Sequence, residues 1–265
     1  MTEALQTAID AALAAGKILK ERRDNFGTIK YKGEIDPVTE VDLQCEKEII
    51  DMISSRFPDH GFLAEESNKS RNLSSEYQWI IDPLDGTVNF AHGYPCYCTS
   101  IGLEVNGQVE LGVVYNPSLD ELFVAEKGKG AFLNSKPIKV SSISNLKQSM
   151  LVTGFAYDVS HANNNNLDHF ENFLKSCQAV RRPGSAALDL CYTAMGRFEG
   201  FWEIKLHPWD MAAGKLLLEE AGGKLSLFDG SDFDLYKRQI VPTNGMVHDA
   251  MLDILKKGKP AEVMS

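Results

Sequence analysis

The chain has 265 residues, a formal net charge of -10 and 43% hydrophobic residues, enough for one large domain or two closely packed halves. The acidic balance, without any basic stripe, argues against a surface for nucleic acid or anionic membranes. The five cysteines form no CxxC pair and no apolar run is long enough to span a membrane, so we expect no disulfide framework, no zinc site and no membrane partner. The N-terminal region lacks the basic start of a signal peptide, which favours a cytoplasmic location.

The first half is predicted to begin with two helices and continue as antiparallel strands. Apolar residues at helical spacing predict helices over residues 3 to about 24 and from Thr39 to Pro58. Asn106-Gly107 is a strong hairpin signal. The strands expected around and after this hairpin are 99–105, 108–115, 121–125 and 130–133.

The second half follows residue 147 and alternates strands with helices. Strands are predicted over 150–155, 198–204 and 240–241, and helices after residue 166, from about 186 to Gly196, over 208–221 and at the end of the chain. Paired helices between mixed sheets predict a layered α/β (α+β) sandwich in the order αβαβα, with largely antiparallel sheets. The absence of repeats and linkers indicates one unit, 1–265, with a seam near residue 147.

The stretch WIIDPLDGTVNF is an apolar run that ends in two carboxylates and a glycine turn. Asp82 and Asp85 can point to one side of that turn, where the carbonyl of Leu84 also faces, and an all-oxygen site of this kind suits Mg²⁺ or Mn²⁺. If a helix opens next, the amides of Gly86 and Thr87 form an anion site. Turn capping by the two carboxylates is the structural alternative.

Further acidic residues lie elsewhere in the chain, and each alone fits a structural role. Asp42 follows Thr39 in a capping pattern, Glu65 ends another apolar run, and Asp210 lies at a helix start. Glu203 lies in an aromatic strand, where an unpaired buried carboxylate would be costly. We expect Lys32, His92 and His207 to be solvated or supporting residues, because Mg²⁺ prefers oxygen ligands.

Several motifs resemble the inositol monophosphatase family, of the lithium-sensitive, magnesium-dependent phosphatase superfamily. The motifs are DPLDGTVNF, FLAEES, GVVYNP, KGKGAF, RRPGSAALD, GRFEGFWE, WDMAAG and EEAGG, and they follow the expected order over nearly the whole chain. The resemblance is to bacterial-type inositol-1-monophosphatases. It implies the layered sandwich fold predicted above and the hydrolysis of inositol monophosphates by in-line attack of a metal-activated water. It also implies two or three Mg²⁺ per site, with Mn²⁺ as a substitute, lithium sensitivity and a homodimer.

The resemblance assigns roles to individual residues. It implies a water-orienting pair, Asp42 and Thr87, that acts with Glu65, and it divides the chain into a metal-binding half, 1–147, and a substrate-recognition half, 148–265. The implied metal ligands are Glu65, Asp82, the Leu84 carbonyl, Asp85 and Asp210. The implied substrate-binding residues are Asp85, Gly86, Thr87, Ser185, Ala186, Glu203 and Asp210. Ser185 stands where the family commonly has threonine, and both side chains offer a hydroxyl.

Two alternatives remain open at this point, other substrates and a binding role, and a third, a haloacid dehalogenase-type phosphatase, is discounted. Relatives act on histidinol phosphate, fructose 1,6-bisphosphate or 3′-phosphoadenosine 5′-phosphate. A haloacid dehalogenase-type phosphatase has a similar DxDGT motif, but its two acids are two residues apart instead of three. A binding protein of the same fold, associated with the transcription machinery, is the non-enzymatic alternative.

Overall fold

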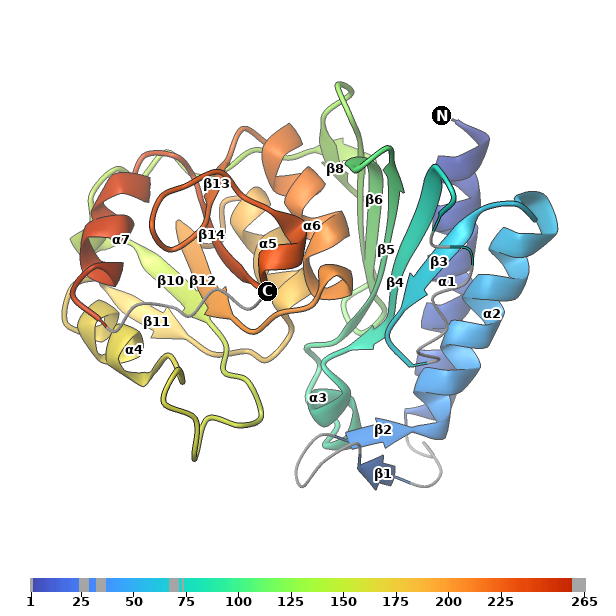
Figure 1. The fold of residues 1–265 in the computed structure, drawn as a ribbon, viewed down its shortest axis with the longest axis horizontal. Coiled ribbons are helices and arrows are strands. Elements are labelled where there is room, and N and C mark those ends of the chain that lie inside the picture. Colours follow the sequence, from blue (N-terminus) through green and yellow to red (C-terminus); the bar gives the residue numbers. More distant parts are fainter. Residues whose placement is uncertain (1, 24–28, 32–36, 67–71, 73, 259–265) are drawn as a thin grey trace.

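The computed structural model describes residues 2–23, 29–31, 37–66, 72 and 74–258, which form five layers (Figure 1). Helices α1 (Glu3–Arg22) and α2 (Glu40–Arg56) cover one face of a seven-stranded sheet. Between this sheet and a five-stranded one lie α5 (Ala186–Ala194) and α6 (Pro208–Glu220), and α4 (Leu167–Leu174) and α7 (His248–Leu255) form the opposite outer layer. The predicted αβαβα order is confirmed.

The seven-stranded sheet has the order β3-β4-β5-β6-β7-β8-β9, and only its β3–β4 pair is parallel. Asn106 and Gly107 have φ values of 50° and 78°, the positive angles that a two-residue type I′ hairpin turn requires. The four strands expected around this hairpin are found with ends shifted by at most one residue. The strands are β3 (Gly61–Ala64), β4 (Tyr77–Asp85), β5 (Cys98–Val105), β6 (Gln108–Asn116), β7 (Glu121–Glu126), β8 (Ala131–Leu133) and β9 (Lys136–Pro137).

The five-stranded sheet has the order β11-β10-β12-β14-β13, in which β10 is parallel to both neighbours and the other pairs are antiparallel. Its strands are β10 (Met150–Thr153), β11 (Ala179–Arg181), β12 (Gly200–Ile204), β13 (Lys224–Ser226) and β14 (Gln239–Thr243). The predicted strand 150–155 was too long by two residues, and 198–204 began two residues too early. Strands β11 and β13 were missed, because three-residue edge strands show too little alternation to be recognised.

Five further short elements complete the described chain. Strands β1 (Ile29–Tyr31) and β2 (Pro37–Thr39), which the sequence did not indicate, form an antiparallel pair. Helix α3 (Thr87–Ala91) follows β4, and single 3₁₀ turns span Leu146–Gln148 and Leu235–Lys237. No helix among the described residues is long and apolar enough to cross a membrane.

Helix α6 packs unusually close to the seven-stranded sheet because small residues meet there. A Cβ added to Gly112 of β6 would lie 2.7 Å from the carbonyl oxygen of Ala213, and one added to Gly102 of β5 would lie 3.1 Å from the Cβ of Ala212. This close contact joins the two halves. It also brings the N-terminus of α6, which carries Asp210, to the end of β4.

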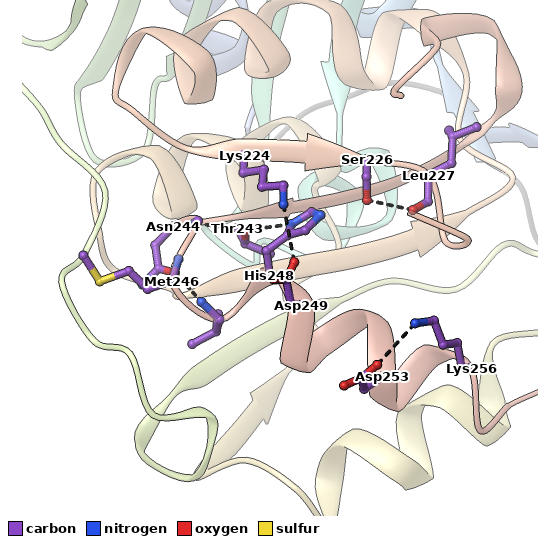
Figure 2. Close-up of polar contacts among 12 residues, drawn as sticks. Lys224, Ser226, Leu227, Thr243, Asn244, Met246, His248, Asp249, Asp253 and Lys256 are labelled. Carbon is purple, nitrogen blue, oxygen red and sulfur yellow. Dashed lines mark hydrogen bonds and ion pairs between the residues drawn. The ribbon is translucent and has the colours of Figure 1, made fainter. Parts of the chain in front are cut away.

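The C-terminal helix α7 is tied to the five-stranded sheet by polar contacts (Figure 2). The Thr243 hydroxyl of β14 lies 3.0 Å from Nδ1 of His248, and the Lys224 ammonium of β13 lies 3.4 Å from the Asp249 carboxylate. Asn244 accepts the Met246 amide at 3.0 Å and so shapes the turn between strand and helix. These contacts fix the outer layer without reaching the acidic residues of β4.

Candidate active site

A β-bulge in β4 turns Asp82 and Asp85 to the same face of the sheet. Asp82 pairs with Ser100 of β5 and Asp85 pairs with Cys98, with a register shift between the two pairs. Residues three apart on a regular strand point to opposite faces. The extra residue of the bulge reverses that relation, so the two carboxylates lie together.

The N-terminus of α5 holds Asp85 in place. The Ser185 hydroxyl donates a hydrogen bond of 2.6 Å to Asp85 Oδ2, the Ala187 amide donates one of 2.8 Å, and the Ala186 amide also hydrogen-bonds the carboxylate. Burial raises the pKa of Asp85 to about 6, and these hydrogen bonds, Ser185 first, limit the rise. A helix of the second half therefore orients a carboxylate of the first half.

Asp82 and Asp210 each use one carboxylate oxygen within the protein. The Leu84 amide donates to Asp82 Oδ1 at 3.0 Å, and the His207 amide donates to Asp210 Oδ2 at 2.6 Å. Their other oxygens accept no hydrogen bond from the described residues. The pKa values of both acids are raised well above the usual value. Burial is the largest cause, and the negative charges of the neighbouring carboxylates raise the two pKa values further.

Glu65 joins this cluster from the end of β3. Its amide donates to the Ile81 carbonyl at 3.2 Å, and its charge helps to raise the pKa of Asp82, Asp85 and Asp210. Sequence reasoning missed a supporting residue here, the buried Glu46, whose Oε2 accepts the Glu66 amide at 2.8 Å. The available signal was its position one helical turn after Asp42.

Asp42 and Thr87 meet across the site, although 45 residues separate them. The Thr87 hydroxyl lies within hydrogen-bond distance of Asp42 Oδ1, at 3.0 Å, and of the Leu84 carbonyl, at 3.1 Å. Asp42 Oδ2 accepts the Thr39 amide at 2.8 Å and completes the predicted capping box at the start of α2. Burial raises the pKa of Asp42, and hydrogen bonds from Thr39 and Thr87 oppose the rise.

Gly86 allows the close approach of two segments, and α3 begins directly after it, as expected. Its φ of 93° favours glycine, and a Cβ there would lie 2.8 Å from the Cys96 carbonyl oxygen. The Asn89 amide group donates to that same carbonyl at 2.7 Å and to the Pro183 carbonyl at 2.8 Å. Helix α3 is thereby attached to the segment that precedes α5.

Glu203 on β12 marks the other end of the site. Burial raises its pKa to about 8, Asp85 contributes to the rise, and the Arg182 guanidinium opposes it. Asp189 of α5 was not anticipated, although it lies one turn after Ser185. It is buried, its Oδ1 has no hydrogen-bond partner among the described residues, and burial and then Glu203 raise its pKa well above the usual value.

The donor set fits a hydrated divalent cation better than a fully enclosed one. Within the described ranges, no three His, Cys, Asp or Glu side chains form a preformed metal cage. Mg²⁺, however, keeps several waters and takes only one or two carboxylates together with substrate phosphate. The open oxygens of Asp82 and Asp210, and the mutual pKa elevation of the acids, provide oxygen ligands of that kind.

Comparison with known proteins agrees with this geometry. The model of the inositol monophosphatase family matches residues 1–258. The chain belongs to the inositol monophosphatase family. It is therefore a phosphoric monoester hydrolase by family.

Individual relatives of this phosphatase cover nearly its whole length. It is 46% identical to an inositol-1-monophosphatase of Synechocystis over 95% of this chain and 88% of the relative. The structure of an inositol monophosphatase from Anabaena superposes with a TM-score of 0.89 at 45% identity, covering 97% of this chain and 96% of that chain.

Two other relatives bear on cofactor and partners. A solved IMPase/NADP phosphatase complexed with Mg²⁺ and phosphate matches with a TM-score of 0.82 at 26% identity, over 93% of this chain and 92% of that chain. A Nus factor SuhB of Pasteurella multocida is 39% identical over 98% of this chain and 97% of the relative. The relatives thus include a phosphatase solved with Mg²⁺ and phosphate and a protein named Nus factor SuhB.

The remaining candidates of this inositol monophosphatase family member lie outside the cluster. His92 is exposed at the end of α3, and the His207 ring stacks on Trp209 with centroids 4.6 Å apart. Neither therefore replaces an oxygen ligand. Lys32, which the sequence predicts to be solvated, lies outside the described residues.

Proposed function

We propose that this phosphatase hydrolyses inositol monophosphates to inositol and phosphate with Mg²⁺ as cofactor. The observation that carries the proposal is the convergence of Asp82, Asp85 and Asp210 with Glu65 at the end of β4, next to the start of α3. Four acids in so small a volume repel a phosphate ester unless cations neutralise them. The names of the most similar relatives support the substrate class.

The metal ligands in this proposal are those that the sequence resemblance implied: Glu65, Asp82, the Leu84 carbonyl, Asp85 and Asp210. Two or three Mg²⁺, or Mn²⁺ in their place, would lower the pKa of a water and neutralise charge on the phosphate oxygens. The chain itself contributes orientation. The Leu84 amide holds one oxygen of Asp82, the His207 amide one oxygen of Asp210, and the Ser185 hydroxyl one oxygen of Asp85. These hydrogen bonds fix the orientation of each carboxylate and therefore the direction of its other oxygen.

Asp42 and Thr87 orient the attacking water. Because the Thr87 hydroxyl donates its proton to Asp42, its oxygen lone pairs stay available to accept a hydrogen bond from that water. Asp42 is in turn fixed by Thr39 at its other oxygen. The phosphate would lie against the amides of Gly86 and Thr87 and be attacked in line, without a covalent intermediate.

Glu203 reads a hydroxyl group of the inositol ring. It is buried, and its pKa is raised to about 8 although the Arg182 guanidinium opposes the rise. Its carboxyl group can therefore exchange a hydrogen bond with a substrate hydroxyl in either protonation state, because a hydroxyl both donates and accepts. Ser185 and Ala186 serve substrate binding through Asp85, because their polar groups contact that carboxylate. Asp85 and Asp210 thereby belong to both the metal and the substrate side of the site.

The phosphate-release assay described below also tests the alternative substrates, histidinol phosphate, fructose 1,6-bisphosphate and 3′-phosphoadenosine 5′-phosphate. The homodimer, the cytoplasmic location, lithium sensitivity and a partner in the transcription machinery stay predictions. The last of these concerns a second role that the SuhB-named relative suggests, and it is compatible with catalysis.

A phosphate-release assay across substrates tests the proposal. With Mg²⁺ we expect the highest kcat/KM on an inositol monophosphate, above histidinol phosphate, fructose 1,6-bisphosphate and 3′-phosphoadenosine 5′-phosphate, and no turnover with chelator. Glu203→Gln should raise KM for inositol monophosphate about tenfold, the value of one hydrogen bond, and leave KM for p-nitrophenyl phosphate nearly unchanged. Full turnover in chelator, or preference for another substrate, would overturn the corresponding part.

A further inference from the structure

The loop 154–166, between β10 and α4, is fastened to β12 on both sides of Glu203. It leaves the end of β10 and projects away from the sheet before the chain enters α4 (Figure 1). Trp202 and Lys205 of the β12 segment provide its two attachment points. Glu203 lies between them in the sequence.

Asn166 makes the first attachment. Its side-chain amide donates to the Thr153 hydroxyl and to the Gly154 carbonyl, both at 2.9 Å, and its oxygen accepts the Trp202 indole N–H at 2.8 Å. The Thr153 hydroxyl donates to the Trp202 carbonyl at 2.6 Å. All these polar side chains are buried, so the network is shielded from water. It joins both ends of the loop to β12.

Lys205 and Asp158 make the second attachment. Their ammonium and carboxylate groups are 2.6 Å apart, and the Lys205 side chain is only 11% exposed. Asp158 also begins a small turn, because its carbonyl accepts the amides of His161 and Ala162. The Arg238 guanidinium donates to the Lys205 carbonyl at 3.2 Å and holds the other side of the pair.

The first residue of the loop packs directly against the Glu203 carboxylate. A Cβ added to Gly154 would lie 2.3 Å from each of the two carboxylate oxygens of Glu203. A side chain at this position would push the carboxylate aside. The Asn166 hydrogen bond to the Gly154 carbonyl therefore sets the position of the surface on which Glu203 rests.

We propose that Asn166, Asp158 and Lys205 are positioning residues that hold the loop 154–166 as a wall beside the Glu203 carboxyl group, and so select substrates with a polyhydroxylated ring. The proposal rests on the function proposed above for its substrate class. None of the three residues touches the phosphate in this account. Loosening the wall therefore weakens binding of the ring and leaves hydrolysis of a phosphate ester without ring hydroxyls intact.

The test compares two substrates, inositol monophosphate and p-nitrophenyl phosphate, in the full-length protein with Mg²⁺. The variants are Asp158→Asn, Lys205→Met and Asn166→Gly. Glycine is chosen because Asn166 has a φ of 66°, which glycine adopts without strain. Each should raise KM for inositol monophosphate about five- to tenfold, the equivalent of one or two lost hydrogen bonds, with kcat on p-nitrophenyl phosphate within about twofold of wild type.

The Asp158 and Lys205 substitutions should not add up in the double variant, because either one alone breaks the same ion pair. The matched control is Lys175→Met, which breaks the exposed ion pair with Glu171 on α4 and should change neither substrate. If these variants lose activity equally on both substrates, or if their KM for inositol monophosphate is unchanged, the proposed positioning role of the loop is wrong, whatever Glu203→Gln shows. Glu203→Gln measured alongside tests the reading of the hydroxyl separately, since equal losses there would overturn only that assignment.

Discussion

At the residue scale, the two carboxylate oxygens of Asp42 accept hydrogen bonds from two different parts of the chain. One carboxylate oxygen completes the capping box at the start of α2, and the other accepts the Thr87 hydroxyl. The sequence offered a cap and a water-orienting pair as alternatives for this residue. The geometry is consistent with both, because the two oxygens of a carboxylate accept hydrogen bonds independently.

Thr87→Val should therefore lose most of its turnover, about 100-fold or more, because general acid–base groups contribute factors of this order. Its melting temperature should change little, since the capping box stays intact. Thr87→Ser should retain activity, because it keeps the hydroxyl. Steady-state kinetics and thermal unfolding on the same preparations provide the measurement.

Asp42→Asn should also lose turnover, and the double variant with Thr87→Val should be scarcely slower than either single one, because the pair acts as a unit. Multiplicative losses would contradict this coupling. They would return Asp42 to the role of a helix cap and leave Thr87 without a catalytic partner.

At the element scale, local patterns predicted the helices and the central strands, whereas contacts between distant segments escaped them. The Asn106-Gly107 hairpin and the cap at Thr39 depend on neighbouring residues, which is why the sequence sufficed. The bond between Ser185 and Asp85 spans 100 positions. The bulge in β4 is set by pairing with β5. The turn sequence therefore predicted that Asp82 and Asp85 point to one side, but it did not reveal the bulge that causes this.

Helix α7 offers a pH-dependent test of how an outer element is held. His248 is buried, burial lowers its pKa to about 4, and the Lys224 ammonium adds to this (Figure 2). The unfolded chain takes up a proton on this histidine near pH 6.5, while the folded protein does not until about pH 4. His248 therefore makes the folded state less stable as the pH falls through this interval.

We expect the free energy of unfolding of wild type to fall by about 2 kcal/mol more than that of His248→Leu between pH 7 and pH 4.5. Urea unfolding at both pH values measures the difference. The comparison between the two proteins cancels the contribution of the acidic cluster, which is present in both. Parallel pH profiles would show that His248 titrates normally and does not anchor α7 as a neutral residue.

At the scale of the whole molecule, the two halves meet through the acidic site. Helix α6 from the second half packs against β5 and β6 through Gly102 and Gly112, and α5 hydrogen-bonds Asp85. The N-termini of α2, α5 and α6 carry or contact the acids, and their positive ends partly offset the accumulated charge. The negative charge that is not offset means that ionisation of the acidic cluster destabilises the metal-free protein.

The most direct test of the central claim, that this cluster is a Mg²⁺ site, is the melting temperature with and without Mg²⁺ from pH 6.5 to 8.5, for wild type and Asp82→Asn. The pKa of Asp85 is raised to about 6 and that of Glu203 to about 8, while Asp82 and Asp210 lie well above their usual values. The folded state thus holds protons that the unfolded chain has lost. Its stability in chelator should accordingly fall as the pH rises.

Mg²⁺ at about 100 times its Kd should restore about 2.7 kcal/mol, or about 5–10 °C, with a larger shift at higher pH. Asp82→Asn, which removes one buried charge, should be more stable than wild type in chelator at pH 8.5 and should lose most of the Mg²⁺ shift. A metal-free melting temperature that stays constant or rises with pH, together with an equal Mg²⁺ shift in Asp82→Asn, would contradict the account.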